Sequence, residues 1–564
     1  MAALAAAPDA LTLQRLYQWE KTAREQIAFT QPLGGGAVRD YRWGEVVDQA
    51  RRMAAHLQSV GIGPGDRVAI LSKNTVHWML SDYAIFMAGA VSVPLYPTLA
   101  PKTIRQILEH SGSKLLFVGK LDGWEHMKAG IPAGVPCIAH PLASEDAKRI
   151  HPQWDDIVAR TAPLAGEPVR AADELCTLIY TSGTTGMPKG VMHTFGTLAF
   201  AVQTGLTRIP LNADTRMLSY LPLSHVVERA LVEHGQLARG FRVYFADSLQ
   251  TFADDMQRAR PTVFFSVPRL WVKFQQAVLH KMPQNRLDLL LRLPIVSGIV
   301  KKKILTTLGL DQCVMAISGA APVPPELLRW YGHLGLKVAE GYGLTENCAL
   351  SHITEPGEDV GTVGRTYDGV ECRIEPASGE ILVRSAATMT GYYRQPELTQ
   401  QVFTADGFLR TGDKGSIDAR GNLKITGRVK DLFKTSKGKY VAPAPIEDKL
   451  VMHTAVEACC VTGANLGQPL ALVMLNLEAM REAAGADGRS ALERSLAEHL
   501  QSINATLDPH EQLECIVVTD EAWTVDNDLI TPTFKVKRNR IEERFAAHYD
   551  QWEKERKKVI WHAV

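Results

Sequence analysis

The stretch Tyr180–Gly190, YTSGTTGMPKG, combines glycines, hydroxyl side chains and one lysine directly after the apolar run Leu175–Tyr180. Glycines let backbone amides approach an anion closely, hydroxyl groups add donors, and lysine adds positive charge. The stretch is not a Walker A motif, which requires lysine immediately after the second glycine, because Met187 and Pro188 precede Lys189. The loop therefore favours a phosphate site, with a mobile surface turn as the structural alternative.

Strand-like runs and helical patterns alternate on both sides of this loop. Residues 41–61 have helical spacing that stops at a glycine, and residues 66–72, DRVAILS, predict a short buried strand. A helix over 102–112 and a strand over 114–119 follow, and further apolar runs occupy 217–222, 242–247, 261–268 and 314–319. This alternation predicts an α/β fold, in which ligands bind at the carboxyl ends of the strands.

The sequence pattern changes near residue 365, where short predicted strands and turns replace the alternation of strands and helices. Asp418–Asn422 predicts a hairpin turn, and a short hinge is expected near Val429 and Lys430. We therefore expect a large N-terminal multi-subdomain α/β domain over residues 1–429. A small, mobile α+β domain is expected over residues 430–564.

The composition excludes some classes of partner. Lysine and arginine number 62 against 61 acidic residues, so a net charge of +1 gives no field that would attract nucleic acid, and none is expected as a partner. The eight cysteines show no CxxC pair and no spacing suited to zinc, which favours reduced, mostly buried thiols.

The first residues make a poor secretory signal, so a cytoplasmic location is expected. The most membrane-like segment, residues 78–96, contains Asp82 and Pro94. Both residues favour a buried helix followed by a strand over a bilayer span.

Four further positions carry side chains suited to a nucleotide. In GYGLTEN, residues 341–347, Glu346 suits Mg²⁺ near a triphosphate, with Thr345 beside it as a phosphate donor. Asp413 in RTGDKG can accept both ribose hydroxyls, and Arg428 can contact ribose or phosphate. Taken singly, Glu346, Asp413 and Arg428 each have a structural alternative: a charge at a helix N-terminus, a turn residue and a surface ion pair, respectively.

Taken in order, these motifs resemble the adenylate-forming, or AMP-binding, superfamily of acyl-CoA synthetases, luciferases and peptide-synthetase adenylation domains. The resemblance spans nearly the whole chain and rests on YTSGTTGMPKG, SYLPLSH, SGAAP, GYGLTE, GEILVRS, RTGDKG, GRVKD and TPTFK. Within the superfamily, VPRLWVKF, the insertion from Ala277 to Asp311 and the stretch 432–447 resemble long-chain fatty acyl-CoA synthetases.

The resemblance implies an ATP-dependent acid–thiol ligase with ATP, Mg²⁺ and CoA as cofactor and co-substrates. A fatty, long-chain carboxylate would form acyl-AMP and release pyrophosphate, and CoA would then displace AMP. The alternatives are a ligase for medium-chain or aryl acids, an acyl-AMP ligase that loads a separate carrier protein, and a non-catalytic nucleotide- or lipid-binding homologue. Chain length and oligomeric state stay open.

The resemblance also assigns residues to the first half-reaction. Lys535 of TPTFK would span the acyl carboxylate and the α-phosphate, Thr345 and Glu346 would act at the phosphates and Mg²⁺, and His225 would shape the carboxylate site. The remaining nucleotide contacts fall into three groups. They are the phosphate loop (Thr181, Ser182, Gly183, Thr184, Thr185, Gly186 and Lys189), the adenine site (Ala320, Ala321, Tyr342 and Gly343), and Asp413 with Arg428.

The second half-reaction is expected to need a rotated small domain. Lys430 matches the hinge position, and Gly438 in TSKGKY would leave room for the pantetheine arm of CoA, with an ordinary turn glycine as the alternative. Candidates for the acyl pocket lie between Ser224 and Arg229 and around Phe265–Trp271.

Two departures from the family pattern occur near the site. Phe195 stands where a histidine is frequent, with His193 two positions earlier, and Asn347 stands where a small hydroxyl residue is frequent. The insertion segment 285–305 mixes apolar residues with three lysines, Lys301–Lys303. It predicts either an amphipathic element near a fatty substrate or the inner face of a membrane, or an ordinary helix broken by Pro294.

Overall fold

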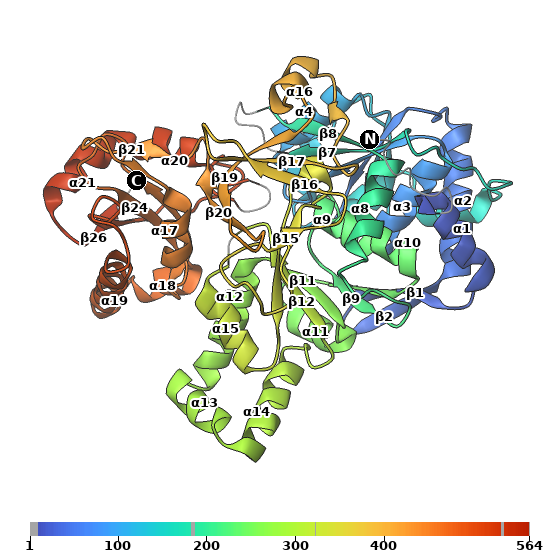
Figure 1. The fold of residues 1–564 in the computed structure, drawn as a ribbon. Helices are drawn as coiled ribbons and strands as arrows, with labels where there is room; N and C mark the ends of the chain where they lie inside the picture. Colours follow the sequence, from blue (N-terminus) through green and yellow to red (C-terminus); the bar gives the residue numbers. More distant parts are fainter. Residues whose placement is uncertain (1–9, 182–186, 322, 532–534, 563–564) are drawn as a thin grey trace.

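The computed structural model of the protein describes residues 10–181, 187–321, 323–531 and 535–562. Figure 1 shows a large body and, beside it, a smaller C-terminal unit in orange and red. The predicted order of a large α/β domain followed by a small α+β domain is confirmed.

The central sheet of the large domain consists of β3 (Arg67–Leu71), β4 (Val91–Leu95), β5 (Leu115–Val118), β6 (Cys137–Ala139), β7 (Leu175–Thr181), β8 (Lys189–Thr194) and β18 (Gly391–Tyr392). Their order is β18-β8-β7-β4-β3-β5-β6. The strands from β3 to β7 pair in parallel, whereas β8 runs antiparallel to β7. The glycine-rich stretch therefore connects the two strands of a hairpin, an orientation that the sequence pattern did not predict.

Helices connect and cover these strands in the predicted alternation. They are α2 (Trp43–Ser59), α3 (Val76–Met87), α4 (Pro101–Ser111), α5 (Trp124–Met127), α6 (Glu145–Ile150), α7 (Trp154–Arg160), and α8 (Phe195–Gly205). The predictions for 41–61, 66–72, 102–112 and 114–119 are confirmed by α2, β3, α4 and β5.

Helix α3 is buried along its whole length. Its one carboxylate, Asp82, is fully buried and accepts a hydrogen bond from the equally buried Arg229. Since β4 follows directly, the segment 78–96 forms a core helix and a strand, as predicted. In the described ranges, no helix combines the length and apolar character that a membrane span requires.

Two further sheets complete the α/β part. One contains β1 (Ile27–Gly34), β2 (Ala37–Arg42), β9 (Arg216–Ser219) and β10 (Arg242–Phe245), and the other contains β11 (Val263–Ser266), β12 (Met315–Gly319), β13 (Val338–Tyr342), β14 (His352–Ile353) and β15 (Arg365–Thr366). The four apolar runs predicted after β7 coincide with β9, β10, β11 and β12. Short helices lie between them, namely α9 (Val226–Glu228), the π-helix η3 (Arg229–His234), α10 (Gly235–Arg239) and α11 (Phe252–Ala259).

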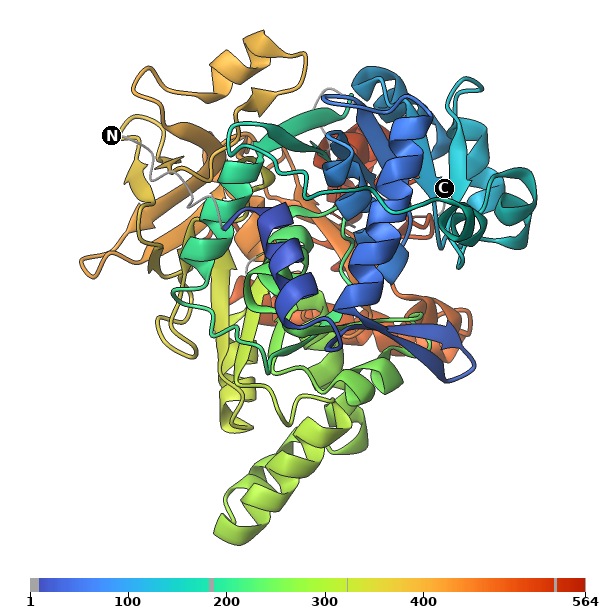
Figure 2. The same ribbon diagram turned by 90° about the vertical axis from the view of Figure 1, so that its right-hand side faces the viewer.

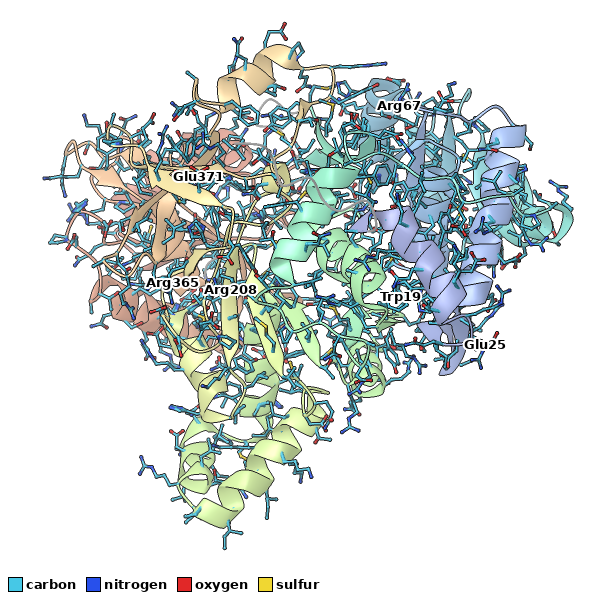
Figure 3. All side chains as sticks on the ribbon, turned by 45° about the vertical axis from the view of Figure 1, so that its right-hand side comes forward. Trp19, Glu25, Arg67, Arg208, Arg365 and Glu371 are labelled. Atoms are coloured by element: carbon cyan, nitrogen blue, oxygen red, sulfur yellow. The ribbon has the colours of Figure 1, made fainter. Side chains whose placement is uncertain are left out.

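Helix α1 (Thr12–Thr22) packs against both α2 and α10. The ring of Trp19, labelled in Figure 3, stacks on Trp43 of α2 at 6.1 Å between centroids. Its indole N–H donates to the carbonyl of Leu237 at 2.6 Å. Gly240 ends α10 with a φ of +73°, and a Cβ there would lie 2.7 Å from the Trp19 ring, so this position requires glycine.

A smaller antiparallel sheet follows, built from β16 (Glu371–Ile374), β17 (Glu380–Arg384), β19 (Leu409–Ile417) and β20 (Leu423–Arg428), with α16 (Pro396–Val402) before β19. The turn between β19 and β20 is the predicted hairpin turn. Asp418 accepts hydrogen bonds from the backbone N–H groups of Arg420 and Asn422. The register of the hairpin places Asp413 opposite Arg428.

The C-terminal unit has its own sheet and its own apolar core. The sheet has the order β23 (Val456–Thr462), β24 (Leu470–Leu475), β25 (Ile516–Thr519) and β26 (Val559–His562), and a small hairpin of β21 (Phe433–Lys434) and β22 (Tyr440–Val441) precedes it. The helices of the unit are α17 (Pro443–Leu450), α18 (Leu477–Glu482), α19 (Ala486–Asn504), α20 (Arg538–Phe545) and α21 (Tyr549–Glu555).

The predicted insertion forms a helical hairpin that projects from the large domain (Figures 1 and 2). Helices α12 (Pro268–Lys281) and α15 (Pro325–His333) pack at its base, and α13 (Gln284–Leu291) and α14 (Pro294–Thr307) form the projection. Pro294 occupies the first turn of α14, where its missing N–H costs no hydrogen bond. It therefore starts a second helix and does not break a single one.

Candidate active site

A cavity of about 770 Å³ lies between the ends of the strands of the large domain and the start of the C-terminal unit. It brings together most of the residues expected from the sequence. The predicted residues that line it are Thr181, Lys189, His225, Ala320, Tyr342, Gly343, Thr345, Glu346, Arg428, Lys430 and Lys535.

The other predicted residues stand apart from this lining. Ser182, Gly183, Thr184, Thr185 and Gly186 lie outside the described residues.

Ala321 is exposed beside Ala320, and Asp413 lies behind the wall. Gly438 forms the turn between β21 and β22, where its N–H donates to Thr435 at 2.9 Å. The structure thus does not bring Gly438 to the cavity.

Strands β7 and β8 hold the two ends of the glycine-rich stretch at the cavity. Thr181 pairs with Lys189 in the antiparallel ladder, and both side chains line the wall. Gly190 follows Lys189, and a Cβ there would lie 3.1 Å from the ring of Tyr180. The lack of a side chain at Gly190 therefore lets β8 pass close to that buried ring.

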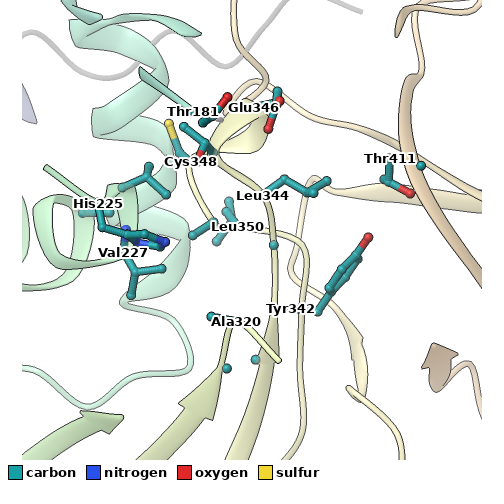
Figure 4. A pocket seen from close by; sticks show the side chains of 18 of the residues that line it. Thr181, His225, Val227, Ala320, Tyr342, Leu344, Glu346, Cys348, Leu350 and Thr411 are labelled. Carbon is teal, nitrogen blue, oxygen red and sulfur yellow. The ribbon is translucent and has the colours of Figure 1, made fainter. Parts of the chain in front are cut away.

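Glu346 lies at the same end of the cavity as Thr181 (Figure 4). Its Oε1 accepts a hydrogen bond of 2.8 Å from the phenol of Tyr392, and the Lys189 ammonium lies 5.3 Å from the centre of that ring. Burial lowers the pKa of Lys189, and nearby Lys430 adds to this, whereas Glu346 opposes it.

The described residues contain no group of three or more potential metal ligands. Mg²⁺ is commonly held by one or two carboxylates together with substrate phosphates, so the carboxylate of Glu346 on the wall fits an ion that arrives with ATP.

Asp413 anchors a group of side chains behind the opposite wall. Its Oδ2 accepts a hydrogen bond of 2.7 Å from the Tyr342 phenol, and its Oδ1 accepts one of 3.0 Å from Nε of Arg428. Burial raises the pKa of Tyr342 well above its usual range, and the Asp413 charge adds to this, so the phenol stays a donor. A carboxylate has about four acceptor sites, and Asp413 thus keeps capacity for further hydroxyl groups.

His225 caps the N-terminus of α9 and projects into the cavity opposite Tyr342 (Figure 4). Its Nδ1 accepts a hydrogen bond of 3.2 Å from the N–H of Val227. Burial lowers the pKa of His225 to about 4, and the charge of Lys535 adds to this. The ring is therefore neutral near pH 7, and its proton lies on Nε2, which makes that nitrogen a donor.

The two departures from the family pattern lie behind the cavity wall. Phe195 is a core residue that packs edge-on against Phe86, at 5.1 Å between ring centroids. His193 is buried, and its Nε2 lies 2.6 Å from the carbonyl oxygen of Thr345. His193 therefore supports the backbone of the 3₁₀-helix η4 (Thr345–Asn347).

The side chain of Asn347, the last residue of η4, bonds to the backbone at the start of this helix. Its Oδ1 accepts a hydrogen bond of 2.8 Å from the N–H of Leu344, and its side chain is buried. A smaller hydroxyl residue would reach this N–H less easily, so asparagine at this position has a capping function.

Lys535 lines the cavity from the C-terminal unit. Its backbone N–H donates to Oγ1 of Thr531 at 3.0 Å. Enclosure by the surrounding protein lowers the pKa of Lys535, and Arg428 adds to this, while Asp413 and Glu346 oppose it. The cavity thus gathers cations at one end, where they suit a polyanion.

The other part of the cavity is apolar. Its lining comes from the end of α8 and the loop after it, from the turn that contains α9 and η3, and from β11 to β14, and includes Ala201, Val202, Leu206, Ile209, Leu211, Val226, Val227, Ala230, Leu231, Phe265, Ile317, Leu350 and Ile353. This branch suits an alkyl chain.

The predicted acyl-pocket segments contribute only some of their residues to the cavity lining. His225, Val226, Val227 and Phe265 line the cavity, but Trp271 is buried among other core residues at the base of the helical hairpin. The contribution of α8 was missed, because its apolar residues give the same pattern whether a helix faces a core or a ligand.

Comparison with known proteins places the chain in a family. The family described as AMP-binding enzyme matches residues 16–393, and the family described as AMP-binding enzyme C-terminal domain matches residues 430–556. The first match covers well over half of the chain, so the protein belongs to the AMP-binding enzymes.

Within that family, the chain is similar to ligases of fatty acids. It is 32% identical to the long-chain-fatty-acid–CoA ligase FadD15 of Mycobacterium bovis, over 94% of this chain and 95% of that protein. It is 29% identical to the peroxisomal long chain acyl-CoA synthetase 6 of Arabidopsis thaliana, over 91% of this chain and 81% of the relative.

Solved structures share the fold. The A domain of carboxylic acid reductase from Segniliparus rugosus, in complex with AMP and a co-purified carboxylic acid, gives a TM-score of 0.79 at 22% identity, covering 97% of this chain and 94% of that one. The anthranilate CoA ligase AuaEII, in complex with anthranoyl-AMP, gives 0.76 at 21% identity, with 95% and 98% covered.

Proposed function

We propose that the protein is an AMP-forming acid–thiol ligase that activates a long-chain fatty acid as acyl-AMP and transfers the acyl group to CoA, releasing pyrophosphate and AMP. One observation carries the proposal: a single cavity joins a cationic end, with Lys189, Lys430 and Lys535, to an apolar branch beside α8. ATP suits the first part and an alkyl chain suits the second. The relatives named as long-chain-fatty-acid–CoA ligases support this acid class.

In the first step, a carboxylate oxygen attacks the α-phosphorus of ATP, and pyrophosphate leaves. An anion must approach a polyanion, so cations and oriented donors have to be present before the transition state forms. Lys535 bridges the carboxylate and the α-phosphate in this proposal. Lys189 and Thr181 hold the β- and γ-phosphates with the glycine-rich loop, residues 182–186.

Mg²⁺ would neutralise part of the charge on the leaving pyrophosphate. Glu346 is the residue that would hold it, and the hydrogen bond from Tyr392 orients this carboxylate. Thr345 lies beside it and would donate to a phosphate oxygen.

His225 acts at the carboxylate in this proposal. The neutral ring keeps its proton on Nε2, so it can donate a hydrogen bond without adding a second full charge beside Lys535.

The nucleoside is assigned to the wall around Tyr342. Ala320 and Gly343, which line the cavity next to this ring, are assigned to the adenine together with the neighbouring Ala321. Asp413 accepts the ribose hydroxyls with Arg428 beside it. The contacts of Asp413 with Tyr342 and Arg428 support this assignment, because they fix the carboxylate before the nucleotide binds.

In the second step, the CoA thiolate attacks the acyl carbon, and AMP leaves with the bonding electrons. Lys535 has no function here, and the thiol needs a path to the acyl group. We assign the hinge of the small domain, taken as residues 430–564, to Lys430. Rotation about this hinge would bring Gly438 from the β21–β22 turn to the cavity as part of the CoA passage.

The experiment that tests the proposal measures AMP formation by the purified protein with a panel of carboxylic acids, from short to long chains and including aryl acids, with and without CoA. A CoA-dependent rate that is highest for long-chain acids is the expected result. Formation of acyl-AMP without any thioester would favour a ligase that loads a separate carrier protein. Absence of AMP with every acid would favour a non-catalytic homologue.

A cytoplasmic location is part of the proposal. All eight cysteines are free thiols, and most of them are buried, which suits a reducing compartment.

A further inference from the structure

The hairpin of α13 and α14 is firmly attached at its base. Leu287 and Ile304 are buried there with residues of α12 and α15. The indole N–H of Trp330 on α15 donates to Oε1 of Gln284 at 3.0 Å. The projection seen in Figures 1 and 2 is therefore an anchored part of the large domain, and its far end is held away from the body.

The far end of the hairpin presents large apolar side chains to solvent. Leu289 is 61% exposed, Leu293 46%, Ile295 83% and Ile299 65%. Ile295 and Ile299 are four residues apart on α14 and share one face of the helix. Scattered exposed apolar residues are ordinary, but four within residues 289–299 form a patch at one end of a projection.

Cations surround this apolar end. Residues 284–303 contain Arg286, Arg292 and the three lysines 301–303 but a single acid, Asp288, so this short segment has a net charge of +4, whereas the whole chain has +1. In the part of the chain that the structure describes, none of these five cations forms an ion pair. Lys302 lies seven residues after Ile295, about 10 Å along the helix.

We propose that this end of the hairpin is a membrane-docking site, which inserts Leu289, Leu293, Ile295 and Ile299 into the surface of an anionic phospholipid bilayer. Side chains of interfacial helices reach about 5–10 Å into the boundary between headgroups and acyl chains. With the isoleucines at that depth, the lysines lie level with the anionic headgroups. Positive charge and apolar surface together match a bilayer better than they match the surface of a soluble protein.

Under the proposed function, the membrane-docking site would bring the enzyme to its substrate, because long-chain fatty acids partition into membranes. The docking proposal itself does not depend on that function, since its readout is binding to lipid. A failure to bind vesicles would leave the ligase reaction with dissolved acid unaffected.

The test is cosedimentation of the full chain with vesicles of phosphatidylcholine and phosphatidylglycerol, compared with vesicles of phosphatidylcholine alone. We expect binding to the anionic vesicles that weakens as salt is added. The double variant Ile295→Ser/Ile299→Ser should lower the partition coefficient at least tenfold. Lys302→Gln/Lys303→Gln should lower it by about fivefold for each charge removed.

Matched controls separate the hairpin from general surface effects. Leu249→Ser removes an apolar side chain that is 92% exposed elsewhere, and Lys424→Gln/Lys554→Gln removes two exposed lysines away from both the hairpin and the cavity. Both controls should bind vesicles like the wild type. All variants should keep the thermal midpoint and the rate with dissolved acid, because none of these residues contacts the cavity.

Unchanged vesicle binding in Ile295→Ser/Ile299→Ser would overturn the proposal. If that variant also loses self-association, measured by sedimentation velocity, the apolar end is instead a contact between protein molecules.

Discussion

The phenol of Tyr342 at the end of β13 donates a hydrogen bond of 2.7 Å to Asp413 on β19, and so joins two sheets across the wall of the cavity. Arg428, opposite Asp413 on β20, holds the other oxygen of the same carboxylate. The acceptor proposed for the ribose is thus oriented by groups from two sheets before any nucleotide is present, which reduces the entropy that binding has to overcome.

Replacing Tyr342 with phenylalanine tests this orientation. Hydrogen bonds to charged groups contribute about 1.5–3 kcal/mol, so we expect the KM for ATP to rise about tenfold or more, with little change in the KM for the acid. Steady-state kinetics with each substrate varied in turn will measure both constants. Tyr440→Phe, at a tyrosine that is largely exposed, serves as the control. Equal increases for ATP and acid would contradict a specific effect on the nucleotide.

The Lys535→Ala variant separates the two half-reactions. We expect pyrophosphate release that depends on the acid to fall by about 10²-fold or more, because a cation aimed at the developing charge is lost. Thioester formation from supplied acyl-adenylate and CoA should stay substantial. The two half-reactions can be measured separately by pyrophosphate detection and by chromatography of acyl-CoA. Lys554→Ala, on the exposed side of α21, is the control, and unimpaired adenylation in Lys535→Ala would refute the assignment.

Gly438 allows the CoA passage to be tested against a simple backbone effect. Its φ is +76°, so any side chain adds strain, and Gly438→Ala measures that cost alone. Gly438→Leu adds bulk to the same strain. We expect Gly438→Leu to leave adenylation intact and to reduce thioester formation at least tenfold below the Gly438→Ala variant. Equal loss of both half-reactions in the two variants would count against the passage.

Gly205 offers a way to shorten the apolar branch. It ends α8, lines the cavity, and has open space where a Cβ would be added. Gly205→Leu should therefore fill part of the branch without a clash and move the preferred acid to a shorter chain, with kcat/KM for the longest acids reduced about tenfold. Gly332→Leu on α15, also a helical glycine with open space but away from the cavity, is the matched control. The same chain-length profile in Gly205→Leu and wild type would place the alkyl chain elsewhere.

We expect the buried histidine His140 to lower the free energy of unfolding in acid. Burial lowers the pKa of His140 to about 3 in the folded protein, while an unfolded histidine titrates near 6.5. Between these values the unfolded state binds one more proton, so the contribution of His140 is complete above pH 6.5 and falls by about 1.4 kcal/mol per pH unit as the pH is lowered.

His140→Gln should therefore reduce the dependence of the thermal midpoint on pH between 6.5 and 5. Leu249→Ser, which changes an exposed side chain that does not titrate, should leave that dependence unchanged. Parallel curves for wild type and His140→Gln would show that this ring does not titrate on unfolding.

Much of the fold follows from local patterns in the sequence. The strands β3 and β5, the helix α4 and the hairpin turn at Asp418 depend on periodicity and turn residues within short windows, and these predictions are confirmed. The antiparallel pairing of β7 and β8 was missed, because an apolar run has the same composition in either orientation.

The site divides in a similar way. Charged residues in distinctive motifs, such as Glu346 and Arg428, were found and do line the cavity. The apolar wall from α8 and the support that His193 gives to Thr345 were not predicted, since both depend on which faces meet over 150 residues apart. The candidate range Phe265–Trp271 came without an orientation of its side chains for the same reason, and its last residue, Trp271, lies in the core.

Arg428 is the last residue of β20, and Lys430 follows it by two positions. The pair of Asp413 and Arg428 therefore belongs to the sheet of the large domain, and the proposed pivot comes after it. In the proposed mechanism, rotation about Lys430 would therefore move the small domain while Asp413 and Arg428 keep their contacts with the nucleotide. The acyl-AMP intermediate, a mixed anhydride, would then remain sheltered from water between the two half-reactions. Both half-reactions would take place in one cavity without release of this reactive intermediate.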